Sequence, residues 1–553
     1  MKKLDLKKYK GELLFVPIGG SGEIGMNLNL YGYNGKWIIV DMGLGFADVD
    51  LPGVTIIVPN INFIINEIKD DLLGLVLTHA HEDHIGAIPY LWSELKCKMY
   101  ATKFTAEVIK AKCRDFGIIN EVEIIETYSN KEFTIGDFNI NMTHITHSIP
   151  EMNGILIKTK KGNIFHTGDW KFDPNPVIGE ATDENELKKI GDSNILAMVG
   201  DSTNIFDKKH SGSEGELGKN LEKLVSANKK NLVIVTTFAS NVARIQSIAN
   251  AAKKSGKKIV LLGRSLKRIF ASAKEAGYLR DIEIHNEKEI SKIKRSDLLI
   301  ICTGCQGEQL AATSKIADGK HPDVKLKKGD VVIFSSKIIP GNEKKIYTLL
   351  NKFSEMNIDV LTEKNEFVHV SGHPSSLEVS KMYEYIKPKI AIPVHGEAIH
   401  LTEHVKLAKK SGIKHCLSVR NGDVLLLDDK NPMKIGEVES GYYAVDGNLI
   451  LDSENEIIKN RRVLRDNGAI FISIVLNHKK KSIKEMYVKS PGVLEESEDV
   501  ELIEDLKKKI IQVVNSLDTF DTKKIESNLK YSMRKYFVKT LGKSPMICVN
   551  IIS

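Results

Sequence analysis

Short apolar runs alternate with polar turns throughout the first two hundred residues of the chain. The runs have the length and the β-branched content of buried strands. They lie at Leu13–Ile18, Trp37–Val40, Leu73–Leu77, Phe138–Met142, Gly154–Thr159, Asn163–His166 and Ile195–Val199. Helical spacing of apolar residues occurs between some of them, as in Ile85–Leu95 and Lys103–Lys112. This region therefore predicts sheets that are covered by helices.

Between Leu217 and Leu349 strand patterns and helical patterns alternate regularly. The strand patterns lie at Leu232–Thr236, Lys258–Leu262, Leu298–Cys302 and Val331–Ser335, and the helical patterns include Asn241–Ser255 and Leu266–Ala276. Such alternation predicts a parallel, doubly wound sheet. A strand pattern at Lys389–Val394 and a helical one at Leu401–Ser411 follow.

A smaller unit with its own strands and helices is expected after about residue 450. Strand patterns lie at Ala469–Leu476 and Ile483–Val488, followed by an amphipathic helical pattern at Val500–Leu517 and a basic one over about 523–541. The lysines of segment 477–481 are typical of a solvated turn, and a contact with nucleic acid is the alternative.

Length and composition describe an ordinary globular protein of several domains. A chain of 553 residues is too long for one core and suggests about three domains. We expect no membrane contact, because no apolar stretch reaches the roughly 20 residues that cross a bilayer. We also expect no signal peptide, because the basic start has a short apolar part that leads into glycine and charge rather than a small-residue cleavage site. Six scattered cysteines suit a reducing cytoplasm. The net charge of +7 is compatible with a polyanionic partner but does not require one.

The one Cys-x-x-Cys sequence, Cys302 to Cys305, lies at the end of a predicted strand. No second pair with metal-ligand spacing accompanies it, so two incidental small residues are the favoured interpretation. A redox or zinc site is the alternative.

Three histidines and an aspartate are crowded into six residues behind the apolar run Leu72–Leu77, at His79, His81, Asp83 and His84. His79 and His81 are two apart in an extended segment, so both rings can project to one side. Asp83 and His84 follow where the chain turns into a helix, so they can face a second ion. Imidazole nitrogens and carboxylate oxygens suit zinc or manganese. We therefore predict a metal site.

Further donors are expected at other strand ends. His147 and Asp169 lie where predicted strands give way to loops, and a carboxylate such as Asp169 can bridge two cations. Asp41 also ends an apolar strand, and we expect it to fix a ligand imidazole by a hydrogen bond. His144 and His166 alternate out of phase with these donors and are expected to be packed or solvent-facing.

These residues resemble the metallo-β-lactamase superfamily, whose HxHxDH motif is matched from His79 to His84. The resemblance implies an αββα sandwich with two metals at the sheet edges. One ion would be held by His79, His81 and His147, and the other by Asp83 and His84, with Asp169 shared.

Three later segments, 200–204, 369–374 and 393–397, resemble the β-CASP group of nucleases within that superfamily. Asp201, His373 and His395 fall where that group carries its three additional motifs. The resemblance implies that His395 adds a donor to the second ion. It also implies that His373 orients the scissile phosphate or protonates the leaving oxygen. Asp201 would then either hold His373 in place or act as the acid itself.

Within that group the chain resembles the ribonuclease J family from about residue 12 to 450, and the C-terminal unit also fits. The matching segments are 17–25, 237–241, 303–308 and 339–343. The implied α/β fold is a metallo-β-lactamase domain in two parts, an inserted parallel β-CASP domain and a small C-terminal α+β domain. The expected bounds are 1–212 and 351–450 for the two parts, 213–350 for the insertion and 451–553 for the C-terminal domain.

Two segments are expected to bind phosphate. His369, Ser371 and the backbone amides around Val370, Gly372 and His373 can form a nest for it. Ala239, Ser240 and Asn241 open a helix after a strand, so their amides face outward at a positive helix N-terminus. The resemblance implies that these segments line the pocket for a nucleotide and its 5′ phosphate. A helix cap is the alternative for Ser240.

The resemblance implies a 5′-to-3′ exoribonuclease with endonuclease activity that prefers 5′-monophosphorylated single-stranded RNA. It would act in mRNA decay and in rRNA and mRNA maturation, in the cytoplasm, as a homodimer or homotetramer built through the C-terminal domain. Hydrolysis would use a hydroxide activated by two divalent metal ions, with zinc (Zn2+) expected and manganese or magnesium as alternatives. Two alternative functions are a catalytically inactive RNA-binding scaffold and a small-molecule metallo-hydrolase. The metallo-hydrolase would not need the inserted domain.

Overall fold

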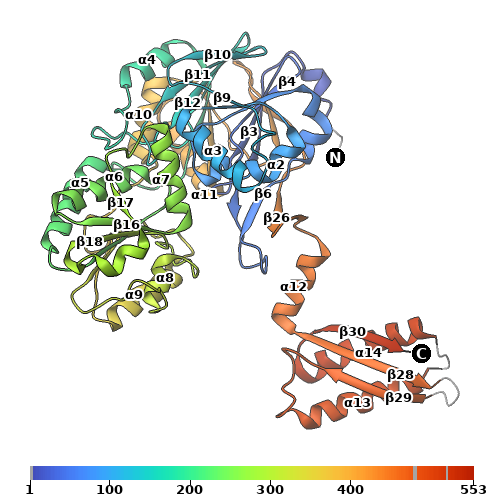
Figure 1. The fold of residues 1–553 in the computed structure, drawn as a ribbon. Coiled ribbons are helices and arrows are strands. Elements are labelled where there is room, and N and C mark those ends of the chain that lie inside the picture. The colour runs from blue at the N-terminus through green and yellow to red at the C-terminus, as the bar shows by residue number, and fades with distance from the viewer. Residues whose placement is uncertain (1–3, 478–481, 518–520, 553) are drawn as a thin grey trace. The chain divides into compact units, whose positions relative to one another are not determined.

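The structure is a computed structural model that describes residues 4–477, 482–517 and 521–552 (Figure 1). Residues 478–481 of the lysine-rich segment lie outside the described residues, so the turn expected there stays a prediction. The chain forms two compact units, one of residues 1–45 and 58–441 and the other of residues 46–57 and 442–553. In the described ranges, no helix combines the length and the apolar character needed to span a membrane.

Two mixed sheets form the centre of the first unit. In spatial order the eight-stranded sheet contains β25 (Met433–Glu437), β24 (Asp423–Leu426), β1 (Leu14–Gly19), β3 (Leu28–Tyr33), β4 (Lys36–Val40), β7 (Leu72–Val76), β8 (Met99–Ala101) and β9 (Ile124–Glu126). The seven-stranded sheet contains β10 (Glu132–Ile135), β11 (Phe138–His144), β12 (Asn153–Thr159), β13 (Gly162–His166), β14 (Ile195–Asp201), β21 (Ile390–Val394) and β23 (His415–Cys416).

One apolar core joins the two sheets, because the inward side chains of both strand sets belong to a single buried cluster. Phe15 and Val40 contribute from the eight-stranded sheet, and Phe138, Ile164 and Ile392 from the seven-stranded one. A second cluster packs helices onto the outer face of the seven-stranded sheet. The helices that accompany the two sheets are α1 (Glu82–Ile85), α2 (Ile88–Leu95), α3 (Lys103–Asp115), α4 (Glu184–Asp192), α10 (Ser376–Ile386) and α11 (Ala398–Lys410). The expected αββα sandwich is confirmed.

Strand direction brings several chain exits to one edge of this sandwich. β13, β14 and β21 run parallel to one another, and β11 has the same direction because two antiparallel pairings separate it from β13. β4 and β7 are parallel in the other sheet. The carboxyl ends of parallel strands share an edge, which is where polar residues after the strands can meet.

A third sheet lies between β14 and β21 in the chain. It is parallel throughout, in the order β17 (Ile284–His285), β16 (Lys258–Leu262), β18 (Leu298–Cys302), β15 (Val233–Thr236), β19 (Val331–Phe334) and β20 (Asp359–Leu361). Its helices are α5 (Glu214–Ala227), α6 (Val242–Lys254), α7 (Arg264–Ala276), α8 (Ala312–Ala317) and α9 (Glu343–Glu355). The parallel sheet is as predicted. It continues past residue 350, where we expected the insertion to end, because β20 pairs with β19.

The second unit contains a three-stranded sheet with two helices on one face. Its elements are α12 (Glu456–Asn467), β28 (Ala469–Asn477), β29 (Ser482–Lys489), α13 (Val500–Asn515), α14 (Thr522–Leu541) and β30 (Met546–Ile552). Ile472 of β28, Ile510 of α13 and Phe537 of α14 share one buried core. The strands β5 (Gly45–Phe46), β6 (Ile56–Pro59), β26 (Tyr442–Asp446) and β27 (Leu449–Asp452) form a separate small sheet.

This unit begins at residue 442 rather than 451, and it includes residues 46–57. Leu51 and Val54 from that early segment pack with Ala444, Leu451 and Ile458. A contact between segments almost four hundred residues apart leaves no periodic pattern in the sequence.

Candidate metal centre

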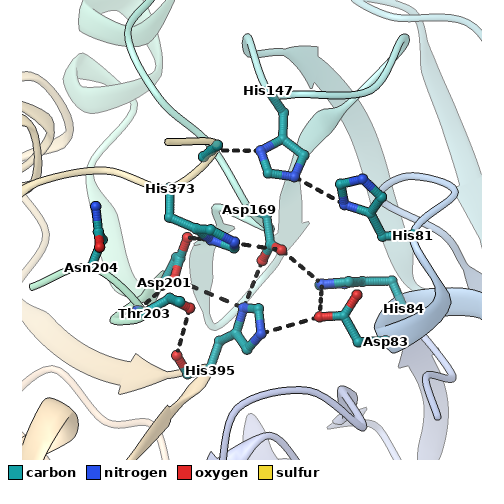
Figure 2. A network of polar contacts seen from close by, with 12 residues as sticks. His81, Asp83, His84, His147, Asp169, Asp201, Thr203, Asn204, His373 and His395 are labelled. Atoms are coloured by element: carbon teal, nitrogen blue, oxygen red, sulfur yellow. Dashed lines mark hydrogen bonds and ion pairs between the residues drawn. The ribbon is translucent and has the colours of Figure 1, made fainter. Parts of the chain in front are cut away.

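The expected metal donors lie just beyond the ends of strands or in the short helix that follows β7, and Figure 2 labels all of them except His79. His79 and His81 follow β7, and α1 holds the next two donors. The remaining donors follow β11, β13 and β21. Together these donors are His79, His81, Asp83, His84, His147, Asp169 and His395. Both sheets of the sandwich therefore contribute to the cluster.

The first donor group contains three imidazoles and one carboxylate. Ligand atoms of His79, His81, His147 and Asp169 lie within 4.8 Å of one another. His81 Nδ1 is 3.1 Å from His79 Nε2 and 3.0 Å from His147 Nε2. His79 Nε2 is 3.9 Å from Asp169 Oδ2. The structure thus brings together the residues assigned to one ion.

The second group contains Asp83, His84, Asp169 and His395, again with ligand atoms within 4.8 Å of one another. Asp169 Oδ2 is 3.1 Å from His84 Nε2, and Asp169 Oδ1 is 2.8 Å from His395 Nδ1. Asp83 Oδ2 lies 3.3 Å from His395 Nε2. Because Asp169 belongs to both groups, its carboxylate occupies the place that bridging two cations requires.

Asp201 and His373 lie beside this centre. His373 Nδ1 is 2.8 Å from Asp201 Oδ2 and 3.8 Å from Asp169 Oδ2. Burial opposes protonation of His373, but the charges of Asp201 and Asp169 outweigh it and raise the pKa of the imidazole. Asp201 therefore fixes a histidine that tends to hold a proton.

Hydrogen bonds from behind fix the orientation of three donors. Asp41 Oδ2 accepts from His84 Nδ1 at 2.7 Å and from the hydroxyl of Thr78 at 2.8 Å. That hydroxyl is 2.9 Å from His79 Nδ1. His147 Nδ1 donates to the carbonyl of Gly372 at 2.6 Å. The expected bond from Asp41 is present, and these contacts direct the Nε2 atoms at the cluster.

Asp41 and His395 adopt backbone conformations that are unfavourable for residues with a Cβ. Their φ angles are 64° and 53°, in the left-handed region that costs energy outside glycine. The amide of His395 donates to the carbonyl of Gly20 at 2.6 Å, and the amide of Asp41 donates to Val76 at 3.0 Å. These bonds hold two side chains of the centre across the ends of their strands.

The protonation states of the first group suit a divalent cation. Burial lowers the pKa of His79 and His147 well below the usual range, and burial lowers the pKa of His81 to about 4. Neutral imidazole is the form that binds metals. Since His147 donates through Nδ1, its Nε2 presents a lone pair. Lone pairs directed at one another are stabilised by a cation between them.

The carboxylates of the second group have the complementary charge. Burial opposes ionisation of Asp83 and Asp169, but His84 and His395 outweigh it and hold the pKa of both carboxyls below the ordinary range. The same attraction, against burial, raises the pKa of His84 well above its usual value and that of His395 to about 10. A cation that binds here replaces protons on these imidazoles. The donor set therefore fits two divalent cations.

The segment expected to bind phosphate runs beside the centre, but part of its backbone is already engaged. The amide of Ser371 donates to Ser211, and the amide of His373 donates to the hydroxyl of Ser371 at 3.0 Å. A Cβ on Gly372 would lie 2.9 Å from Cε1 of His147, so glycine permits this close approach. The buried Val370 packs against Gly212. The predicted nest of amides is therefore smaller than we expected.

His369 lies in positively charged surroundings. Burial lowers the pKa of its imidazole well below the usual value, and the charges of Arg244, Lys337 and Lys171 lower it further. Within the described part of the chain, its Nδ1 is buried without a hydrogen-bond partner. Arg244 is paired with Glu214 and Lys171 with Asp173. Lys337, for which no ion pair is found in the described part of the chain, is therefore the cation left to attract an anion beside His369.

Asn241, rather than Ser240, caps α6. Asn241 is buried, and its side chain accepts from the amide of Arg244 at 2.8 Å. Its expected contact with substrate competes with this bond, whereas Ala239 and Ser240 are half-buried in the preceding turn. Arg244 also donates to Val368 at 3.3 Å, which ties the start of α6 to the phosphate segment.

The residues that we expected to take no part in metal binding lie outside the donor groups. His144 Nε2 is 2.9 Å from the carbonyl of Glu180, and His166 Nδ1 is 2.8 Å from the hydroxyl of Tyr31. Burial raises the pKa of the Cys302 and Cys305 thiols to about 11 and about 12. Buried thiols of this kind fit the interpretation of two incidental small residues.

Sequence reasoning missed several contacts at the centre. Asn27 Nδ2 lies 3.1 Å from His84 Nε2 and donates to the carbonyl of Asp83 at 3.1 Å. Thr203 donates its amide to Asp201 at 2.8 Å and its hydroxyl to the carbonyl of His395 at 3.1 Å. Asn204 donates to the hydroxyl of Ser371 at 3.2 Å. Only the turn-forming sequence 201–204 pointed to Thr203 and Asn204.

Four family models match successive parts of the chain. A beta-lactamase superfamily domain matches residues 36–188, and a ribonuclease J beta-CASP domain matches residues 230–353. A Zn-dependent metallo-hydrolase RNA specificity domain matches residues 357–418, and a ribonuclease J C-terminal domain matches residues 456–553.

Several curated proteins resemble the chain over most of its length. Ribonuclease J of Sinorhizobium meliloti is 38% identical, over 98% of this chain and 97% of that protein. Ribonuclease J 1 of Streptococcus pyogenes is 36% identical, over 85% and 84%. Ribonuclease J2 of Bacillus subtilis is 30% identical, over 98% of both chains.

The fold also occurs in a solved structure. It is a protein of unknown function from Enterococcus faecalis, with a TM-score of 0.53 and 17% identity, and the match covers 75% of this chain and all of that one.

Proposed function

The chain belongs to the ribonuclease J family and is a metal-dependent ribonuclease, and from this premise we propose how it acts. It degrades single-stranded RNA in the 5′-to-3′ direction, prefers a 5′ monophosphate and also cleaves internally. It takes part in mRNA decay and rRNA maturation in the cytoplasm. The observation that carries this proposal is Asp169, which reaches both donor groups beside the Asp201–His373 pair.

We infer that two divalent cations bind at the centre. His79, His81 and His147 hold one, and Asp83, His84 and His395 hold the other, with Asp169 shared. Zinc suits this mixture of imidazole and carboxylate, and manganese or magnesium is the alternative. When bound, such a pair supplies Lewis-acid chemistry that activates water and stabilises charge on phosphoryl oxygens.

His373 is the residue that we propose as the proton donor. Its Nδ1 is bonded to Asp201, so Nε2 is the ring atom that can donate to the leaving oxygen of the cleaved phosphodiester. Asp201 orients the ring and keeps it protonated, while Thr203 positions Asp201 through its amide.

The 5′ phosphate is held, in this proposal, near His369 and Ser371. Arg244 and Lys171 are paired with carboxylates, so Lys337 is the charge that favours an anion there, and the buried Nδ1 of His369 lacks a hydrogen-bond partner among the described residues and is available to bind it. A preference for a 5′ monophosphate over the bulkier triphosphate is part of the proposal. Assembly into a homodimer or homotetramer through the C-terminal domain is also part of the proposal.

The test compares decay of one single-stranded RNA that carries a 5′ monophosphate or a 5′ triphosphate, before and after His369→Ala. We expect the unmodified enzyme to degrade the monophosphorylated RNA faster and the variant to lose that difference while it retains internal cleavage. His144→Ala is the matched control, because among the described residues the imidazole of His144 bonds to a backbone carbonyl, that of Glu180, outside the donor groups. Equal rates on both RNAs for the unmodified enzyme contradict the proposed preference.

A further inference from the structure

The helix α14 in the C-terminal unit carries an unusual concentration of positive charge. Between Thr522 and Leu541 the helix contains six basic residues and one acidic residue, Glu526, a surplus of five. The net charge of the whole 553-residue chain is +7. This one helix therefore holds a surplus of five, which is most of the net charge of the entire protein.

The charges lie on the outer side of the helix. Ile525, Leu529, Met533 and Phe537 form the buried side that packs on the sheet. The basic residues recur on the opposite side at helical spacing and are exposed. The α14 basic face consists of Lys523, Lys524, Tyr531, Arg534, Lys535 and Lys539.

Neighbouring carboxylates offset only a small part of this face. Asp521 caps the helix and accepts from the amides of Lys523 and Lys524. Glu526 pairs with Lys530 at 2.6 Å, at the margin of the helix surface. Among the described residues, none of the five basic members of the α14 basic face forms an ion pair. Like charges along one helix face repel one another, so an anionic partner stabilises them.

The other helix on the same sheet differs in this respect. On α13 the acidic Glu501, Glu504 and Asp505 precede Lys507, Lys508 and Lys509, and Lys507 pairs with Glu504 at 2.7 Å. Its charges balance. The surplus is thus a property of α14 and not of the C-terminal unit in general.

An exposed aromatic ring lies within the α14 basic face. Tyr531 is 61% exposed, and Nζ of Lys535 is 4.5 Å from the centroid of its ring. A large apolar ring in water contributes nothing to the core of the unit. Aromatic rings flanked by cations are the usual platform for an unpaired base and its phosphates.

We propose that the α14 basic face binds single-stranded RNA, with its cations on the phosphodiester backbone and Tyr531 stacked on a base. The site belongs to a different unit from the metal centre and so adds a second hold on the RNA. The inference rests on the proposed function only for the identity of the polyanion. A ring at the centre of the cations favours RNA, because an RNA base can stack on it. An anionic membrane or an acidic protein has no base to stack.

The test measures RNA binding by the full chain after its metals are removed with a chelator. The probe is a fluorescent, unstructured RNA of about 40 nucleotides with a 5′ hydroxyl, followed by anisotropy at several salt concentrations. We expect Lys524→Gln with Lys535→Gln and Lys539→Gln to weaken binding about tenfold and to reduce the salt slope by about 2. The matched control, Lys507→Gln with Lys508→Gln and Lys509→Gln on α13, should change binding less than about twofold.

A second pair of variants tests stacking apart from charge. Tyr531→Ala should weaken binding about fivefold or more, whereas Tyr531→Phe should retain it, because phenylalanine keeps the ring. Circular dichroism and the thermal midpoint show whether each variant keeps its fold. Glutamine is tolerated at exposed helix positions, so loss of folding is not expected.

Three outcomes overturn the proposal. The first is unchanged RNA binding in the α14 variants, and the second is an equal loss of RNA binding in the α13 and α14 triple variants. The third is that the α14 variants lose binding to anionic phosphatidylserine vesicles but keep RNA binding. The probe lacks a 5′ phosphate and the protein lacks metal, so cleavage does not enter the result. If the α14 basic face does not bind RNA, the proposed 5′-monophosphate preference is unaffected. If that preference is not found, the result for the α14 basic face is unaffected.

Discussion

The metal centre and the Arg244 network lie in the same unit, and both bury charge. Arg244 is fully buried and bonds to Glu214 at 2.7 Å, to the carbonyl of Ser335 at 2.8 Å and to the carbonyl of Val368 at 3.3 Å. Each of the three guanidinium nitrogens donates to at least one acceptor of the protein. This network is complete with the residues of the chain alone.

The metal centre differs because its donors face one another. His79 Nε2 and His147 Nε2 both lie about 3 Å from the same nitrogen of His81, while their other nitrogens already have partners. Nitrogen lone pairs this close repel one another, so the arrangement is favourable only when a cation binds between them. The comparison separates a buried polar cluster that supports structure from one that supports chemistry.

Removing one donor of the metal centre should have the largest effect on activity. His147→Ala is expected to lower the rate of RNA cleavage by about a thousandfold or more, because one cation loses an imidazole. The thermal midpoint in chelator should change little. His144→Ala, three residues earlier, should leave the rate unchanged, and a similar loss in both variants would show that the segment matters for packing instead.

Breaking the Arg244 network should instead cost stability. Glu214→Gln leaves a buried guanidinium without its partner charge and should lower the free energy of unfolding by about 3–5 kcal/mol. The matched control is Lys254→Ala, which removes an exposed pair with Glu222 between the same two helices, α5 and α6. Urea unfolding of both variants checks this, and an equal effect would mean that burial of the pair does not matter.

Asp41→Asn should weaken metal binding without removing a donor. The asparagine no longer accepts charge-assisted bonds from His84 and Thr78, so the orientation of the donors is lost in part. A loss of about 10- to 100-fold in metal affinity is expected. Titration of the chelated protein measures it, and unchanged affinity would remove Asp41 from the account.

His404, a buried histidine outside the metal donor groups, gives a smaller, pH-dependent effect. His404 bonds to the hydroxyls of Ser202 and Tyr383, both at 2.8 Å, and burial lowers the pKa of its imidazole to about 4. The unfolded chain therefore binds more protons between about pH 4 and 6.5, so acidification through that window destabilises the fold. His404→Gln should reduce the loss of stability between pH 7.5 and 5 by about 2 kcal/mol. An identical pH dependence of urea unfolding in variant and unmodified protein would contradict this.

Local patterns were sufficient for part of the centre. The crowding from His79 to His84 and the strand-end positions of His147 and Asp169 are visible in the sequence, because strand periodicity fixes where the chain leaves a sheet. Asp201, His373 and His395 entered only through resemblance to a family. No local pattern states that their strands and loops lie beside the first motif.

Other features depend on contacts that periodicity does not encode. Asn27 meets Asp83 across 56 residues, and Arg244 meets Glu214 across 30. An arginine in a helical pattern is expected at the surface, since burial of one requires a partner that the sequence does not identify. The packing of residues 46–57 with the second unit has the same origin.

The most direct test of the central claim is the number of metal ions bound by each chain, measured by elemental analysis together with RNA cleavage. We predict two divalent cations in the active protein, fewer than one in Asp169→Asn, and parallel loss of activity in that variant. A fully active protein that holds one cation or none, or an active Asp169→Asn protein, would contradict the account.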